Sequence, residues 1–260
     1  MRIRTTRLAA SIAMMAVATG VAWSAAPGPG RTAFVIDQVS RAQGGAATGA
    51  TIAALVYELH IKEATLEADA TYIVDRNGRM RIDAYANGKR FVTECYDGRK
   101  GWQMDGDGVV TIESAKGAAT LWRGTQYPGQ ILALAELPAH GHAVAAVGSE
   151  TIDGVVYDVL ELTMSDGFKT WRYADQQNHR ITRGRDTRPL HVDIDPTEAL
   201  IETVWSDFRS VDGVQRSFSS TQTDLHTGKL LQTTTIKSIR KLPGLPDRLF
   251  VPGAAPEVRP

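Results

Sequence analysis

Residues 75–102, DRNGRMRIDAYANGKRFVTECYDGRKGW, decide the fold class of this chain. Three dipeptides, Asn77-Gly78, Asn87-Gly88 and Asp97-Gly98, divide the stretch at intervals of ten residues. Asn-Gly and Asp-Gly favour two-residue type I′ turns, because both central residues need a positive φ angle. The segments between the turns alternate polar and apolar residues, as at residues 79–84. The stretch therefore predicts an antiparallel meander in a strongly curved sheet.

Further alternating segments extend this pattern through the chain. Residues 55–62 place Leu55, Tyr57, Leu59 and Ile61 on one face, which indicates a half-buried strand. Because residues 155–164 are apolar on both faces, we expect the second face of the sheet to be covered there. In all we expect about ten antiparallel strands in one domain. Beyond Pro138 the predicted strands are residues 143–147, 155–164, 168–173, 180–185, 199–210, 214–223 and 229–239.

Two regions have helical spacing instead. Residues 31–43 form a short amphipathic pattern that Gly44-Gly45 ends. Residues 114–137 contain apolar residues at mostly helical spacing, broken by Pro128-Gly129. We expect one helix in the first region and two short helices in the second. The second pair is our candidate cover for the sheet.

The first residues have the features of a secretory signal peptide. Three arginines within the first seven residues precede an apolar run at residues 8–21, and small residues and a proline follow. The run is shorter than the ~20 residues that span a bilayer. We therefore predict a signal peptide at residues 1–26, a single mature domain at residues 27–260, and export of the protein.

Composition excludes several classes of partner. Lys and Arg together number 29, as do Asp and Glu, and the two signs are interspersed. Nucleic-acid binding normally requires a basic stripe, and binding to anionic membranes requires a polybasic patch. We therefore expect no nucleic-acid partner. The single cysteine, Cys95, excludes an internal disulfide, so the core must hold the fold.

The six histidines form no recognisable catalytic or metal motif. His140-Gly141-His142 follows Pro138, and we expect a solvated loop there, because structural zinc needs four converging ligands. His191, Asp193 and Asp195 alternate along a segment that we expect to be extended. A charged segment at a sheet edge is the favoured interpretation of these three residues, and a weak cation site is the alternative.

Catalytic motifs are equally absent from the sequence. It contains no His-Glu-x-x-His, Gly-x-Ser-x-Gly or glycine-rich phosphate loop. Cys95 lies within a predicted strand, where a small buried residue is favoured over a nucleophile. An exported hydrolase has only scattered His, Asp and Ser in its favour. We predict no enzymatic activity, no cofactor and no bound metal.

A set of short motifs in a fixed order resembles a known family, the outer-membrane lipoprotein-sorting proteins around the periplasmic carrier LolA and the receptor LolB. The Arg-Pro-Gly turn expected of that family is Arg76-Asn77-Gly78 in this chain. The resemblance implies a mainly β (α+β) fold, an incomplete, strongly curved antiparallel β-barrel with a helical lid, in the periplasm. The motifs are AQGG at residues 42–45, RNGRMR at 76–81, DGRKGW at 97–102, WSDFRSVDGV at 205–214 and LFVP at 249–252.

The resemblance also implies a function, which is to hold lipid or lipoprotein acyl chains in an apolar cavity between sheet and helices. We expect this cavity to have few polar groups, since burial of each CH₂ contributes ~0.8 kcal/mol without directional bonds. The alternative is an interaction or sensor module on the same scaffold that recognises an envelope protein. The predicted cavity residues are Leu59, Met80, Ile82, Phe91 and Trp102 in the wall and Leu121 and Trp122 in the lid.

Arg81 belongs to the same predicted strand as Met80 and Ile82. In the carrier proteins an inward arginine near this strand hydrogen-bonds the helical lid. Here Arg79 and Arg81 alternate with Met80 and Ile82, so a solvent-facing position for the two arginines is an equally good interpretation.

Overall fold

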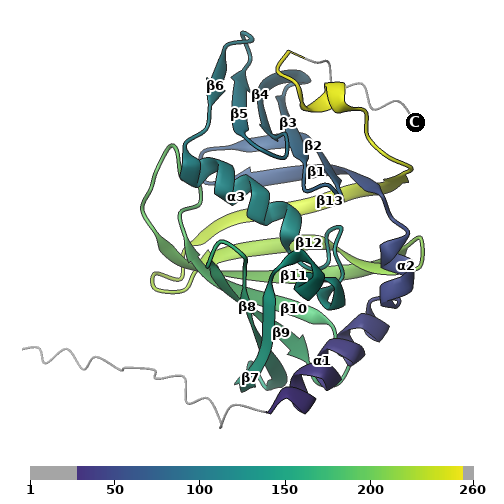
Figure 1. The fold of residues 1–260 in the computed structure, drawn as a ribbon. Coiled ribbons are helices and arrows are strands. Elements are labelled where there is room, and N and C mark those ends of the chain that lie inside the picture. Colours follow the sequence, from purple (N-terminus) through teal and green to yellow (C-terminus); the bar gives the residue numbers. More distant parts are fainter. Residues whose placement is uncertain (1–27, 254–260) are drawn as a thin grey trace, which may run out of the picture.

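One continuous antiparallel sheet organises the fold (Figure 1). The computed structural model describes residues 28–253. The predicted signal peptide, residues 1–26, lies outside the described residues, and the boundaries of the predicted mature domain stay predictions. Within the described range thirteen strands pair in the order β6-β5-β4-β3-β2-β1-β13-β12-β11-β10-β9-β8-β7. The expected antiparallel sheet is confirmed, with more strands than the sequence indicated.

The bounds of the elements agree closely with the alternation in the sequence. The strands are β1 (Ala54–Glu63), β2 (Glu67–Asp75), β3 (Met80–Ala86), β4 (Lys89–Tyr96), β5 (Gly101–Asp105), β6 (Val110–Ile112), β7 (Ala143–Ile152), β8 (Val155–Thr163), β9 (Lys169–Asp175), β10 (Ile181–Arg188), β11 (Ala199–Val211), β12 (Val214–Asp224) and β13 (Leu230–Leu242). The helices are α1 (Pro29–Ala42), α2 (Ala46–Ala50) and α3 (Ala115–Gln126), with the 3₁₀ helices η1 (Leu134–His140) and η2 (Asp247–Phe250).

The strand order explains why helices cover one face. Strands β1 to β6 run outward to one edge of the sheet, and β7 to β13 return from the opposite edge to pair with β1. The chain between β6 and β7 must therefore cross from edge to edge. It does so over the concave face, where α3 packs on β5, β4 and β3 (Figure 1). We call residues 115–140, which include α3 and η1, the lid segment. The predicted curved open sheet with a helical lid is confirmed.

The tight turns differ in detail from the prediction. Asn87 and Gly88 have φ angles of 51° and 73°, as a type I′ turn requires. In the Asn77-Gly78 and Asp97-Gly98 turns only the glycine has a positive φ angle. The reason is an aspartate side chain that bonds to the backbone of each turn. The Asp75 carboxylate accepts the backbone N–H of Asn77 at 3.0 Å, and the Asp97 carboxylate accepts that of Arg99 at 2.7 Å. Such bonds stabilise longer turns.

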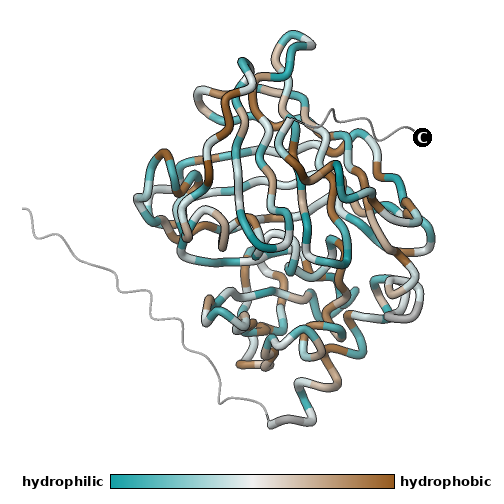
Figure 2. Tube along the Cα trace, turned by 45° about the horizontal axis from the view of Figure 1, so that its top comes forward, coloured by the Kyte–Doolittle hydropathy of each residue, from teal (hydrophilic) through white to brown (hydrophobic). Residues whose placement is uncertain are grey.

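The main apolar core lies between the concave face and the helices. Val35 and Val39 enter it from α1, and Leu134 and Leu137 enter it from η1. The residues from β1, β2 and β3 that share this face follow the period of two along each strand. Figure 2 shows apolar and polar positions mixed along the strands, as expected for a sheet with two different faces.

A second apolar cluster lies on the opposite, convex face and is covered by the C-terminal segment. Trp102 and Cys95 pack there against Leu249 and Phe250. The indole Nε1 of Trp102 donates to the backbone O of Phe250 at 3.1 Å. Burial raises the pKa of the Cys95 thiol to about 12, as befits the predicted small buried residue rather than a nucleophile.

Arg81 is buried beneath the same C-terminal segment. Its side chain is fully buried, its Nε donates to Asp83 Oδ2 at 2.7 Å, and Nη1 donates to Leu249 O at 2.8 Å. The prediction of a solvent-facing side was therefore wrong for Arg81. The physical reason is the C-terminal segment, which covers this polar face of β3 and supplies a hydrogen-bond acceptor to Arg81.

Candidate functional site

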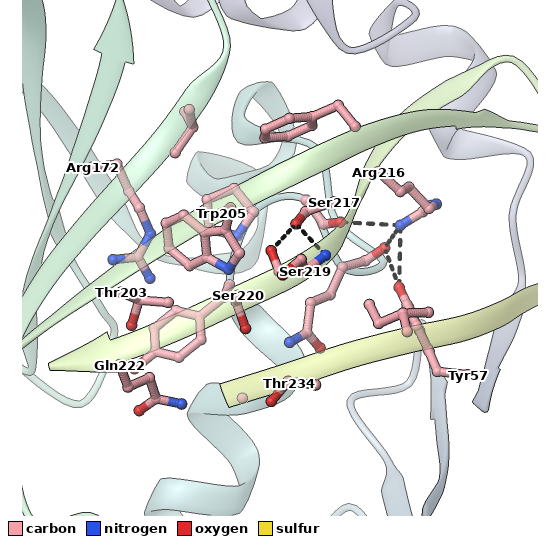
Figure 3. Close-up of a pocket in the computed structure, with 18 of the residues that line it drawn as sticks. Tyr57, Arg172, Thr203, Trp205, Arg216, Ser217, Ser219, Ser220, Gln222 and Thr234 are labelled. Carbon is pink, nitrogen blue, oxygen red and sulfur yellow. Dashed lines mark hydrogen bonds between the residues drawn. The ribbon is translucent and has the colours of Figure 1, made fainter. Parts of the chain in front are cut away.

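A cavity of about 330 Å³ lies between the concave face and the loop that follows α3. The loop contributes Tyr127, Pro128, Gly129 and Gln130, and the floor comes from β1, β2 and strands β9 to β13. It therefore lies under the segment that crosses the sheet, as expected for a lid over a curved sheet. Figure 3 shows side chains from β9, β11, β12 and β13 around this space.

Apolar side chains form one part of the cavity wall. Leu59 of β1 is paired in register with Ile236 of β13, and both line the cavity. Ile181 of β10 and Trp205 of β11 continue the apolar surface. Leu59 is one of the residues that the sequence predicted for this wall.

Polar and charged side chains form the rest of the wall, in larger numbers than we expected. Five serine and threonine residues line the cavity besides three tyrosines, and so do three arginines and one aspartate. An arginine buried at an otherwise apolar surface is costly unless its charge is balanced by hydrogen bonds or an anion. The serine and threonine residues are Thr203, Ser217, Ser219, Ser220 and Thr234, and the charged residues are Arg172, Asp186, Arg188 and Arg216.

Arg172 of β9 defines one end of the cavity. It is 3% exposed, and its guanidinium lies 4.7 Å from the ring centre of Tyr127 and 5.4 Å from that of Trp205. Its Nη1 donates to Trp171 O at 3.1 Å and to Thr170 Oγ1. Burial is the largest cause that lowers the pKa of Arg172. The two rings and these bonds fix the orientation of the cation at the cavity wall.

A glycine on the neighbouring strand makes room for this arrangement. Gly184 of β10 pairs in register with Arg172. A Cβ atom at Gly184 would come within 2.7 Å of Arg172 Nη1 and 2.8 Å of the Trp205 ring. The absence of a side chain at this position is therefore what allows the arginine and the indole to lie together.

Arg216 of β12 lies toward the opposite side of the cavity, beside Tyr57 (Figure 3). Its Nη1 donates to Gly129 O at 3.0 Å, to Tyr57 Oη at 3.3 Å and to Gln130 O. Tyr72 Oη also donates to Gln130 Oε1, at 2.9 Å. Burial raises the pKa of Tyr57, so this phenol stays neutral. These bonds join the loop after α3 to the sheet floor.

The other predicted cavity residues lie elsewhere. Met80 belongs to the main core, and Ile82, Phe91 and Leu121 pack against that core, all outside the set that lines the cavity. Each of the four therefore supports the sheet–lid packing next to the cavity.

The two predicted tryptophans are also displaced from the cavity. The Trp122 ring lies 5.9 Å from the ring of His142. Trp102 is on the convex face, in the cluster with Phe250. The prediction that Trp102 is a wall residue is therefore corrected. The strand register gives the reason: Trp102 pairs with Cys95 and Cys95 with Arg81, and all three side chains lie on the face away from the lid.

His142 corrects the predicted solvated loop at residues 140–142. It is 4% exposed, its Nδ1 accepts the backbone N–H of Ser165 at 3.0 Å, and its Nε2 lies 3.2 Å from Gln126 Oε1. Burial lowers its pKa, which favours the neutral ring. His142 thus joins the end of α3 to the loop after β8, whereas His140 is exposed as expected.

His191, Asp193 and Asp195 do not lie along an extended segment. His191 and Asp195 form a bridge that closes a tight turn, with Asp195 N donating to His191 O at 2.8 Å. His191 Nε2 lies 2.9 Å from Glu63 Oε2, and Asp193 accepts the backbone N–H of Ser114 at 3.0 Å. Among residues 28–253, no group of three or more His, Cys, Asp or Glu is arranged to hold a metal ion.

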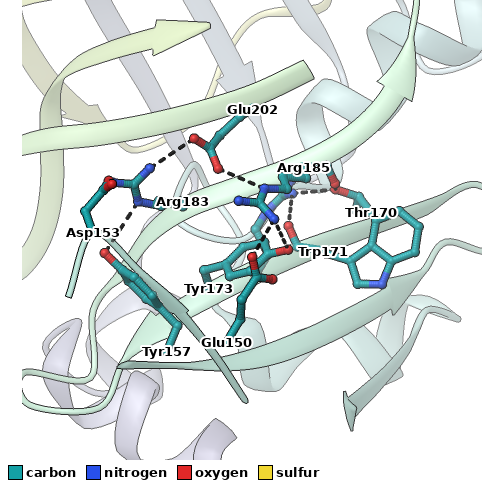
Figure 4. A network of polar contacts seen from close by, with 10 residues as sticks. Glu150, Asp153, Tyr157, Thr170, Trp171, Tyr173, Arg183, Arg185 and Glu202 are labelled. Carbon is teal, nitrogen blue, oxygen red and sulfur yellow. Dashed lines mark hydrogen bonds and ion pairs between the residues drawn. The ribbon is translucent and has the colours of Figure 1, made fainter. Parts of the chain in front are cut away.

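A polar network covers the convex face of β8 to β11 (Figure 4). Glu202 accepts from Arg183 at 3.0 Å and from Arg185 at 2.8 Å, and Arg185 also donates to Glu150 at 2.9 Å. The Arg185 guanidinium lies 4.8 Å from the ring centre of Tyr173. The second face of residues 155–164 is thus covered by arginine side chains, rather than by the helices that we expected there.

No protein-family model and no curated protein matches this chain. Solved structures do. A LolA superfamily protein from Nitrosomonas europaea superposes with a TM-score of 0.54 at 14% identity, covering 85% of this chain and 97% of the other. The chain has the LolA fold.

Two further structures support this assignment. An outer membrane lipoprotein-sorting protein domain from Vibrio parahaemolyticus has a TM-score of 0.55 at 14% identity, with 85% of this chain and 96% of the other covered. A DUF1329 family protein from Desulfovibrio piger has a TM-score of 0.56 at 13% identity, with 85% and 97% covered. In the part of the LolA-like chain that the structure describes, we find no helix both long and apolar enough to cross a membrane.

Proposed function

We propose that this LolA-like chain is an exported, periplasmic binding protein that holds an acyl chain in the cavity beneath the lid segment. The observation that carries the proposal is the set of apolar side chains that line the cavity on the concave face next to the loop at residues 127–130, which are Leu59, Ile236, Ile181 and Trp205. Acyl binding needs an apolar surface shielded from water and little directional bonding.

The size of the cavity favours one chain over several. Its volume of about 330 Å³ is near the lower end of ligand cavities, which run from ~300 to ~1,000 Å³. A bound chain gains ~0.8 kcal/mol for each CH₂ removed from water. The proposed ligand is therefore a single acyl chain of a lipid or lipoprotein.

The proposed location and the absence of catalysis rest on separate supports. The predicted signal peptide at residues 1–26 favours export. The fold is shared with a lipoprotein-sorting domain, which favours a carrier over an enzyme. The alternative, an envelope interaction or sensor module on the same scaffold, needs no ligand in the cavity.

The test is displacement of a fluorescent fatty-acid probe, with a variant that fills the cavity. Ile236→Trp should reduce probe binding at least tenfold, since a larger side chain occupies the space of the acyl chain. Leu230→Trp is the matched control, because Leu230 is on the same strand and 54% exposed. It should bind the probe as the unmodified protein does.

Native mass spectrometry of protein from its own host adds an independent readout. Retained lipid adducts would identify the ligand class. A folded protein that retains no lipid and binds no probe at micromolar concentration would overturn the proposal and favour the interaction module.

A further inference from the structure

We propose that the ligand of this cavity is an anionic amphiphile, whose carboxylate or phosphate binds at Arg172 and whose chain lies along the floor toward Leu59 and Ile236. This inference rests on the proposed function and specifies its ligand class.

The charge of Arg172 is not matched by a carboxylate. Among the residues that the structure describes, none places a carboxylate oxygen within 4.0 Å of its guanidinium, although the side chain is 3% exposed. The nearest acid in the wall, Asp186, accepts instead from Arg188 Nε at 3.0 Å. Two arginines thus face one aspartate at this end. An anion would balance the remaining positive charge.

The guanidinium is also oriented for such a ligand. Its five N–H donors lie in one plane and suit the two oxygens of a carboxylate or phosphate. Its Nη1 donates to Thr170 Oγ1 and Trp171 O, and the Tyr127 hydroxyl is a further hydrogen-bond partner of the guanidinium. These three bonds leave part of the five-donor fork for an anion in the cavity. Tyr127 and Trp205 hold the group from two sides, and Gly184 leaves the space that it needs.

The apolar part of the wall extends away from this end. Ile181 lies on β10, next to β9, and Trp205 lies on β11. Beyond the serine side chains of β12, Ile236 and Leu59 follow on β13 and β1. From β9 to β1 the sheet takes five strand spacings, about 24 Å along its curve. Figure 3 shows Arg172 on one side of Trp205 and Arg216 on the other. A head group at Arg172 therefore leaves its chain on the apolar floor.

Among the described residues Arg216 also lacks a carboxylate within salt-bridge distance, and its buried Nε has no hydrogen bond. We place the head group at Arg172 because Arg216 holds the loop over the cavity. Its Nη1 is committed to Gly129 O, Gln130 O and Tyr57 Oη, which hold residues 127–130 over the cavity. Loss of this arginine should open the loop rather than alter the charge preference of the ligand.

The experiment compares three amphiphiles with the same tail by calorimetric titration below their micelle concentrations. Dodecanoate and dodecyl phosphate should bind about 10- to 100-fold more tightly than dodecanol, as expected for a charge-assisted hydrogen-bonded pair. The order of the two anions distinguishes a carboxylate from a phosphate ligand. This comparison uses the unmodified protein and needs no variant.

Variants then locate the preference. Arg172→Met should reduce the preference for the anions to less than about threefold while dodecanol binding is kept. Arg172→Lys should retain part of it. Gly184→Ala should weaken anion binding by displacing the guanidinium. Arg209→Met is the matched control: this arginine also lies over a ring, 4.4 Å from the centre of Phe218, but pairs with Asp207 outside the cavity wall.

The outcomes are distinct. Equal binding of all three ligands would overturn the anionic head group and leave the acyl-binding function standing. No binding of any of them would overturn the proposed function itself. A preference for anions that persists in a folded Arg172→Met protein would overturn the assignment of Arg172.

Discussion

Asp193 accepts the backbone N–H of Ser114 at 3.0 Å, across 79 positions of sequence. Ser114 is the N-cap residue of α3, and its hydroxyl also donates to the Asp193 carboxylate while accepting from Gly117 N at 3.0 Å. The loop between β10 and β11 thus supplies a negative charge at the N-terminus of the lid helix, where the helix dipole favours one. The stability of the lid helix therefore depends on a loop remote in sequence.

Asp193→Ala should loosen the first turn of α3. We expect a loss of about 0.5–1 kcal/mol, the usual contribution of an anion at a helix N-terminus. Hydrogen exchange of residues 115–120 should become faster, with the core of β8 unchanged. Asp195→Ala is the control, because the Asp195 carboxylate accepts from Thr197 N, within its own loop. Unchanged exchange in α3 would contradict the role of Asp193.

His191 should make stability depend on pH. The hydrogen bond that His191 Nε2 donates to the Glu63 carboxylate raises the pKa of His191 above its ordinary value. A raised pKa means that the contribution is present below about pH 6.5, the ordinary value for histidine, and is lost as the pH rises through the folded pKa. The difference in unfolding free energy between the unmodified protein and His191→Gln should thus shrink from pH 6 to pH 9. Urea titrations measure it.

His226→Gln serves as the control for that series, since His226 is exposed. It should change the unfolding free energy by less than about 0.5 kcal/mol, as substitutions at exposed positions usually do. A His191→Gln difference that grows with rising pH would have the wrong sign and would exclude the Glu63 pairing.

Arg76 should contribute most to holding the lid segment against the sheet. It donates to Gly49 O and Ile52 O, each at 2.6 Å, and to Glu136 of η1 at 2.7 Å. Arg76→Met should lower the unfolding free energy by about 2–3 kcal/mol, because several charge-assisted bonds are lost together. Arg41→Met, which removes an exposed pair with Asp37, should cost less than about 0.5 kcal/mol. Equal losses in the two variants would refute this role.

The buried pair of Arg81 and Asp83 should behave as a unit. Both side chains are fully buried, with Arg81 Nε 2.7 Å from Asp83 Oδ2. Arg81→Met alone should cost about 3–5 kcal/mol, because it leaves the Asp83 charge uncompensated. Arg81→Met with Asp83→Leu should cost less than the sum of the two single changes. Denaturant unfolding of all four proteins measures the coupling, and strict additivity would argue against a direct pair.

The sequence by itself determined most of the elements and their order in the chain, although α2, β6 and η2 were not predicted. Alternation at residues 55–62 and 79–84 and the helical spacing at 31–43 and 114–137 each arise from local periodicity, which needs no tertiary contact to be recognised. The turn dipeptides likewise determined where the strands are connected. They did not determine the type of two turns, in which the Asp75 and Asp97 side chains bond to the backbone.

Only the tertiary structure decided which face of each strand looks into the cavity. In β9 the sequence offers Trp171 and Tyr173 on one face and Thr170 and Arg172 on the other. Hydrophobicity alone would favour the aromatic face as the cavity wall. In the structure Arg172 lines the cavity, and Tyr173 lies on the other face beneath Arg185. Trp102 was assigned to the wrong face for the same reason. A period of two defines two faces, and which of them is concave depends on the direction in which the whole sheet curves and on what the lid segment and the C-terminal tail then cover.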